Sequence, residues 1–165
     1  MKKVTDERAA NLILGVVLLI SVVSYLFDGF VVPNISPFLS KVIPGIEAFS
    51  TSTKYYVEAK SLWSLQWFLF PFLLVFIVFV SFLGQTKAKI NIFSFFVFIL
   101  FFVFCFYFAY TGLNFETGSE KAVGKLSKLY ASSYFGVYLL SGAVWVGIYS
   151  MLFLSCRVLR SLIKN

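Results

Sequence analysis

The sequence predicts an all-α, polytopic integral membrane protein in which four transmembrane helices form one antiparallel bundle. Hydrophobic residues make up 60% of the 165 residues and charged residues 13%, and the mean hydropathy is +0.91. A soluble domain of this length needs many more polar residues to cover its surface. The apolar residues also gather in four runs of roughly 20 residues, the length at which an α-helix crosses the hydrocarbon core of a bilayer.

The four runs divide a single membrane domain, residues 1–165, into spans and connecting segments. The predicted spans are residues 11–32, 62–83, 90–110 and 134–154. Each span must be helical because lipid offers the backbone no hydrogen-bond partner. The first span follows the basic stretch "MKKVTDER" and therefore also resembles a secretory signal. Since no small-x-small cleavage site follows it, we expect an uncleaved signal-anchor.

The basic residues predict how the chain is oriented in the membrane. The net charge is +7, which would suggest a nucleic-acid partner only in a soluble protein. Short segments rich in Lys and Arg stay on the cytoplasmic side. Eight of the 14 basic residues lie at the N-terminus, in the turn at residues 84–89 and in the C-terminal tail. We therefore expect cytoplasmic termini, outer loops at residues 33–61 and 111–133, and no nucleic-acid partner.

Tryptophan and tyrosine residues gather toward the predicted outer side. These side chains prefer the level of the lipid headgroups, so we expect most of them to act as interfacial anchors, among them Trp63, Trp67 and Tyr130. Trp145 and Tyr149 do not follow this pattern. The asymmetry favours a role for the outer half of the protein in recognition.

No pattern in the sequence indicates catalysis or a cofactor. The chain contains no histidine, which excludes histidine-ligated haem and histidine proton relays. No charged residue lies deep inside a predicted span, where ion-coupled transporters carry charges. Cys105 and Cys156 lie on the order of 20 Å apart in depth, too far for a disulfide. We therefore expect neither an enzyme nor a conventional transporter, and no metal, cofactor or small-molecule substrate.

Small residues form a stripe on the fourth span. At 3.6 residues per turn they fall on one face of a helix: Ser132, Gly136, Ala143, Gly147 and Ser150. Small side chains let two helix backbones approach closely in lipid, where packing drives helix association. The stripe therefore predicts a contact either with another span of this chain or with a foreign transmembrane helix. We place Gly136, Ala143 and Gly147 among the candidate partner-binding residues.

The first outer loop opens with "PNISPFLSKVIPG", which predicts a short surface helix. Ser36 is expected to cap this helix with Pro37 at its first position, and Pro44-Gly45 is expected to end it. The apolar residues would then share one side, so that the helix lies flat in the headgroups; they are Ile35, Phe38, Leu39 and Val42.

The second outer loop, "GLNFETGSEKAVGKLSKLY" at residues 112–130, has two halves of different character. Three lysines recur at helical spacing and predict a basic amphipathic helix that lies against headgroups: Lys121, Lys125 and Lys128. The tract before it places Asn114, Glu116 and Thr117 just outside the membrane. These three residues are candidate partner-binding residues, although a plain turn would have the same composition.

At these positions the chain resembles the immunity proteins against pore-forming colicins of the colicin A type. The second periplasmic loop of that family begins with Asn-x-Glu and a Leu-Thr-Thr-like tract. Here "NFETGS" supplies Asn114, Glu116 and Thr117 but lacks the Leu and the paired threonines. "ERAANLIL" is similar to the family's Ala-Asn pair at Ala10 and Asn11, and "STST" at residues 50–53 is similar to its Ser/Thr-rich tract. The four-span layout matches over the whole chain.

The resemblance implies binding and no chemistry. Such a protein resides in the bacterial inner (cytoplasmic) membrane, where it meets the apolar helices of an inserting pore-forming toxin and blocks channel opening. Its partners would be the toxin and membrane lipids. A small structural or assembly subunit of a larger membrane complex would show the same four plain spans and packing stripe, so both functions stay open at this point.

Overall fold

A computed structural model describes residues 6–83, 92–112 and 128–164 of the chain. The helices are α1 (Asp6–Leu26), α2 (Asp28–Asn34), α3 (Ser36–Leu39), α4 (Pro44–Thr51), α5 (Tyr56–Leu83), α6 (Ile92–Thr111) and α8 (Tyr134–Lys164). Residues 128–132 add one more helical turn. No strand occurs in these described ranges, which confirms the all-helical class.

Four of these helices are long and apolar enough to cross a bilayer, which indicates a multi-pass membrane protein. Their bounds differ from the predicted spans. The first predicted span, residues 11–32, breaks at Phe27, which has left the helical conformation at φ −120° and ψ 21°. Asp28 then starts α2, where its carboxylate is favoured by the partial positive charge of the helix N-terminus.

The other long helices extend beyond the apolar runs. α5 begins at Tyr56 rather than at residue 62, and α8 continues to Lys164 rather than ending at residue 154. The extension of α8 is held by contacts at that end of the bundle. The guanidinium of Arg160 donates to the carbonyl of Ser81 on α5 over 3.3 Å, and Arg157 lies 5.5 Å from the ring centre of Phe153. A hydropathy profile does not assign Arg157 and Arg160 to the helix, because their side chains are charged, although both pack against other residues in the fold.

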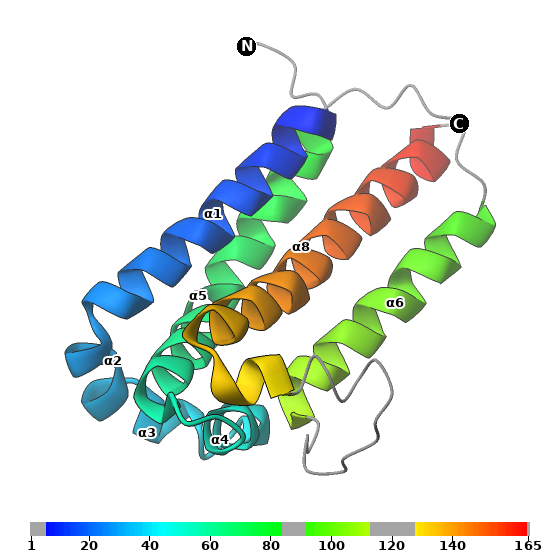
Figure 1. Cartoon of the computed structure of the whole chain (residues 1–165). Helices are drawn as coiled ribbons and strands as arrows, with labels where there is room; N and C mark the ends of the chain where they lie inside the picture. The colour runs from blue at the N-terminus through cyan, green and yellow to red at the C-terminus, as the bar shows by residue number, and fades with distance from the viewer. Residues whose placement is uncertain (1–5, 84–91, 113–127, 165) are drawn as a thin grey trace.

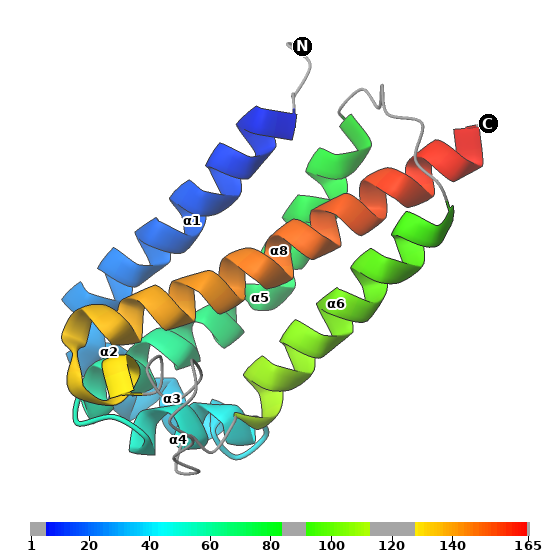
Figure 2. The same cartoon turned by 45° about the vertical axis from the view of Figure 1, so that its right-hand side comes forward.

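α8 is the central helix of the bundle. It packs against α1, α5 and α6, whereas α6 packs mainly on α8 and on the short helix α4. Figure 1 shows the start of α1 and the end of α8 at the same end of the bundle, with α2, α3 and α4 at the other end. The turned view in Figure 2 shows the same arrangement. The short helices thus form a cap, α2 to α4, over one end of the long ones.

Aromatic packing attaches this cap to the bundle. The ring of Phe49 on α4 stacks on Trp63 of α5, with ring centres 4.0 Å apart and planes within 5° of parallel. Trp63 Nε1 donates to the Tyr130 hydroxyl over 3.2 Å, and that hydroxyl donates to the Phe49 carbonyl over 2.9 Å. Burial raises the pKa of Tyr130 above its ordinary value, so its hydroxyl stays protonated and able to donate even in alkaline solution.

The tryptophans predicted to anchor in headgroups lie instead in the protein core. Trp63 and Tyr130 are fully buried and Trp67 nearly so. Trp67 packs edge-on against Trp145 of α8, with ring centres 5.2 Å apart. The prediction of interfacial anchoring is wrong for these residues because the cap and α8 cover the rings that hydropathy assigns to the membrane surface.

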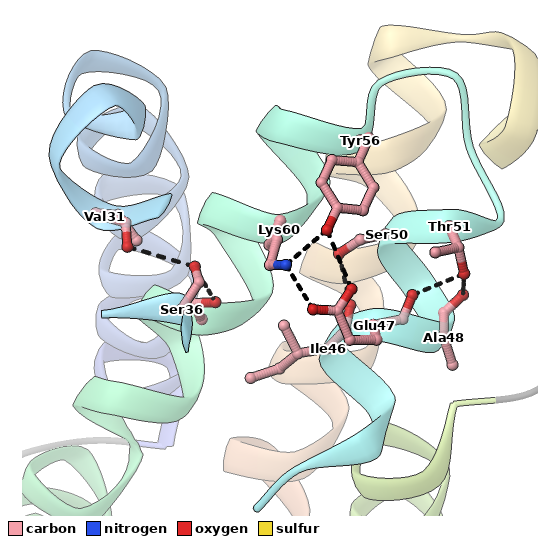
Figure 3. Close-up of polar contacts among 10 residues, drawn as sticks. Val31, Ser36, Ile46, Glu47, Ala48, Ser50, Thr51, Tyr56 and Lys60 are labelled. Carbon is pink, nitrogen blue, oxygen red and sulfur yellow. Dashed lines mark hydrogen bonds and ion pairs between the residues drawn. The ribbon is translucent and has the colours of Figure 1, made fainter. Parts of the chain in front are cut away.

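The first outer loop also differs from its prediction. Ser36 makes no capping hydrogen bond; its hydroxyl lies 2.7 Å from the Ser64 hydroxyl of α5 and donates to the Val31 carbonyl (Figure 3). Pro44 begins α4 rather than ending α3. The four apolar residues do not share one face: Phe38 and Val42 are exposed, whereas the other two pack into the interior, namely Ile35 and Leu39.

Two glycines allow α4 to approach the end of α6. A Cβ on Gly45 would collide with the Ala109 carbonyl oxygen and would lie 2.7 Å from that of Tyr110. Gly112, directly after α6, has a φ of +67°, and a Cβ there would collide with Ala48 of α4. Residues with a side chain rarely adopt that φ. Backbone therefore packs on backbone where the second outer loop leaves the membrane helix.

Candidate partner-binding surfaces

The predicted polar tip cannot be placed directly. Asn114, Glu116 and Thr117 lie outside the described residues, as do Lys121 and Lys125. Lys128 is described and is exposed. The tip follows Gly112 by two residues in the sequence, and Gly112 itself lies against Ala48 of α4.

Hydrogen bonds join the segment that follows α4 to the helical turn at residues 128–132. The Thr53 hydroxyl donates to the Tyr130 carbonyl over 3.0 Å, and the backbone N–H of Lys54 donates to the Ala131 carbonyl over 3.2 Å. Thr53 belongs to the "STST" tract that contributes to the family resemblance. This tract therefore meets the end of the second loop, which spacing in the sequence alone could not show.

A polar cluster on the outside of the cap links α4 to α5 (Figure 3). Lys60 of α5 forms an ion pair with Glu47 of α4 and donates to the Tyr56 hydroxyl over 2.6 Å. The Tyr56 hydroxyl also donates to the other Glu47 carboxylate oxygen over 3.1 Å. A partly exposed pair of this kind contributes about 1 kcal/mol or less, so we assign the cluster a positioning role in the cap.

The small-residue stripe does not act as one surface. Gly136 lies against residues 128–132, and a Cβ there would collide with the Leu129 carbonyl. Gly147 faces α6, where a Cβ would lie 3.8 Å from the Cys105 sulfur. Ala143 is exposed and lines a groove on the side of α1. Ser132 precedes α8 and is not part of that helix. Gly136 and Gly147 thus contact this same chain.

The groove at Ala143 was not predicted from the sequence. It runs between α1 and α8 with a volume of about 800 Å³. Most of its lining is apolar, and tyrosines from both helices contribute to it. Among the lining residues are Leu14, Leu18, Tyr25, Tyr134, Tyr138 and Ala143. The sequence signal that could have found it is the position of Tyr25 and Tyr134, which stand at the end of the first long helix and at the start of the last one.

α6 is the least buried of the four long helices. Only 6% of its most apolar 18 residues is buried, against 28% to 39% in the other three. Large exposed side chains lie along one face of this helix, among them Phe93, Phe96, Leu100, Phe104 and Tyr107. Within the described chain its other face packs on α8 and α4, with ring contacts from Trp67 and Phe70 of α5. The rest of its surface faces lipid or another membrane helix.

A polar set in the interior was also missed by the sequence analysis. Gln66 of α5 is fully buried, and neither atom of its amide has a hydrogen-bond partner among the described residues. The same holds for the Ser141 hydroxyl and the Tyr149 hydroxyl on α8. An amide at this depth is costly without a partner. A search for uncharged polar residues within the spans would have found Gln66.

Within the described ranges, no group of three His, Cys, Asp or Glu side chains could hold a metal ion. Both cysteines are free thiols. Comparisons of the chain with protein-family models, with curated proteins and with solved structures found no match.

Proposed function

We propose that this chain is an immunity protein of the bacterial inner membrane, which binds a pore-forming bacteriocin within the bilayer and keeps its channel closed. The proposal rests on the resemblance at Asn114, Glu116 and Thr117 and on one structural observation, the unpacked surface of α6. A protein that acts in this way needs an apolar face for the toxin's membrane helices and a polar outer rim that selects the toxin.

α6 meets both requirements. Its exposed side chains offer an apolar surface along the length of a membrane helix. Its end at Thr111 leads, through Gly112, to the polar tip that starts at Asn114. Helices associate in lipid through packing, because the hydrophobic effect supplies no driving force there. The toxin's apolar helices would therefore be bound by α6 and recognised by the tip.

The same surface supports a second function, that of a small assembly subunit. A permanent partner in a larger membrane complex would cover α6 in the same way. The two functions differ in when the partner is present: a subunit co-purifies with its partner in cells that have never met a toxin, whereas an immunity protein is isolated without one.

The proposed orientation places both termini in the cytoplasm and residues 112–130 in the periplasm. We expect a single cysteine at Ser119 to react with an impermeant maleimide in intact spheroplasts, and one at Thr86 to stay unlabelled. Both variants are made in a background that lacks Cys105 and Cys156. Lysed cells provide the control, since both sites should then react. Labelling at residue 86 alone in intact spheroplasts would reverse the orientation.

The function is tested by expression in cells exposed to a panel of pore-forming bacteriocins. We expect protection against one of them, with the resting membrane potential unchanged in its absence, because no charged path is expected through the spans. A voltage-sensitive dye and a survival assay measure the two quantities. Protection against none of the panel, together with co-purification of a host membrane protein, would favour the subunit; ion flux through the reconstituted protein alone would contradict both functions.

A further inference from the structure

The groove between α1 and α8 has the character of a ligand site. Its volume of about 800 Å³ lies within the range of small-molecule sites, which extends to about 1,000 Å³. Both views show α1 and α8 side by side, and the two helices are in contact (Figures 1 and 2). Since both are membrane-length helices, the groove is open to the acyl chains of the bilayer.

At Tyr134 and Tyr138 the groove continues into a second pocket, called the polar pocket after the serine and tyrosine hydroxyls in its lining, although carbon atoms make up most of that lining. This second pocket has a volume of about 650 Å³ and is lined by Tyr55, Ser132, Ser133, Tyr134, Phe135 and Tyr138. Three of these residues also line the groove, namely Tyr134, Phe135 and Tyr138. An apolar groove that ends at a group of hydroxyls suits an amphiphile, whose chain would lie in the groove and whose headgroup would lie at the hydroxyls.

The rings at this junction form an electron-rich cluster. Tyr134 lies at its centre: its ring centre is 6.1 Å from that of Tyr25, 5.4 Å from that of Tyr55 and 5.1 Å from that of Tyr138. The first two rings stand nearly perpendicular to Tyr134. Tyrosine faces attract an organic cation such as an ammonium group.

Two carboxylates add negative charge near this cluster. Glu58 of α5 acts electrostatically on the hydroxyls of both Tyr134 and Tyr138, and Asp28 of α2 acts on that of Tyr138. Neither carboxylate forms an ion pair within the described part of the chain. Two exposed lysines belong to the segments that line the polar pocket: Lys54 precedes Tyr55, and the backbone carbonyl of Lys128 accepts from the Ser132 hydroxyl. Charges of both signs therefore lie near this end of the groove.

We propose that the groove and the polar pocket bind one phospholipid with a zwitterionic ammonium–phosphate headgroup. One acyl chain lies in the groove, and the ammonium lies among Tyr25, Tyr55 and Tyr134. The phosphate faces the Ser133 hydroxyl, because the Ser132 hydroxyl donates to the Lys128 carbonyl. A transmembrane helix is about 10–12 Å across and fits less well, because α1 and α8 already meet at the floor of the groove. A Cβ on Gly142 of α8 would lie 4.0 Å from Val17 of α1.

The proposal is tested by native mass spectrometry of the purified protein in mild detergent, without any toxin. Phosphatidylethanolamine, phosphatidylcholine and phosphatidylglycerol with identical acyl chains are offered in equal amounts. We expect one bound lipid per chain, with the two ammonium lipids preferred over phosphatidylglycerol by roughly tenfold. Glu58→Gln should reduce this preference, whereas the exposed Glu7→Gln should not.

Variants that fill the groove test where the lipid lies. Gly142→Leu and Ala143→Leu should both lose the bound lipid, whatever its headgroup. Gly15→Leu is the matched control, because a Cβ at Gly15 meets nothing within 4 Å and this residue does not line the groove. Circular dichroism checks that each variant is folded. If Gly142→Leu does not fold, Ala143→Leu alone tests the groove, because Ala143 is exposed and its substitution should not disturb the fold.

Three results would overturn the proposal. The first is equal binding of all three lipids, and the second is a bound lipid that survives in a folded Ala143→Leu variant. The third is that the protein binds a second protein chain instead of a lipid, and that variants with a filled groove no longer bind this chain. None of these results depends on whether the protein protects cells from a toxin.

Discussion

Gly45→Ala is expected to destabilise the protein by about 3 kcal/mol, near the upper end of the usual cost of overpacking. The added methyl would collide with the Ala109 carbonyl and lie 2.7 Å from that of Tyr110, and both atoms belong to the backbone of α6. Backbone cannot move aside as a flexible side chain does, so α4 must separate from α6. Thermal unfolding in detergent measures the loss.

Gly29→Ala is the matched control for this substitution. Gly29 is the second residue of α2, as Gly45 is the second residue of α4. A Cβ at Gly29 meets nothing within 4 Å, and a surface substitution of this kind changes stability by about 0.5 kcal/mol or less. If the two variants unfold at the same temperature, α4 and α6 do not pack as described.

The largest expected effect on function is at the polar tip. Under the proposed function, Glu116→Ala or Asn114→Ala should sharply reduce protection of the cells against the toxin. The reason is that the binding energy of an interface concentrates in a few residues. Loss of about 2 kcal/mol of binding corresponds to a roughly 30-fold change in affinity. The lowest toxin concentration that kills the cells measures this change, with the abundance of the protein in the membrane determined in parallel.

Lysine variants from the same loop provide the comparison. Each lysine near anionic headgroups contributes about 1 kcal/mol, so a single loss is tolerated. Lys121→Ala, Lys125→Ala and Lys128→Ala should each leave protection almost unchanged. Loss of protection in these variants, with protection kept in the Asn114 and Glu116 variants, would mean that the basic half of the loop recognises the toxin.

Hydropathy alone predicted the four membrane helices, because each needs only a sufficient length of apolar residues. It could not predict the cap. Pro44-Gly45 reads as a helix end in sequence, yet Pro44 starts α4 and Gly45 provides the contact with α6. Trp63 reads as an interfacial anchor, yet it stacks on Phe49 beneath the cap. Both outcomes depend on partners that lie far away in the chain.

The candidate site was predicted less well than the fold, for a similar reason. The periodicity of the small residues in α8 is a property of one helix, whereas their role depends on which neighbour each one meets. Gly147 meets α6, Gly136 meets residues 128–132, and Ala143 meets the groove beside α1. One stripe in the sequence therefore serves three different surroundings, and only the arrangement of the other helices separates them.

The central position of α8 also bears on how the protein is made. α8 follows the other three long helices in the sequence, and yet it is the helix on which all three pack. A ribosome delivers the chain from its N-terminus, so α6 enters the membrane before its main neighbour exists. During that interval α6 can pack only on α4 and on two rings of α5, Trp67 and Phe70, which contact Phe106. Slow insertion of α8 would therefore leave α6 without its main packing partner.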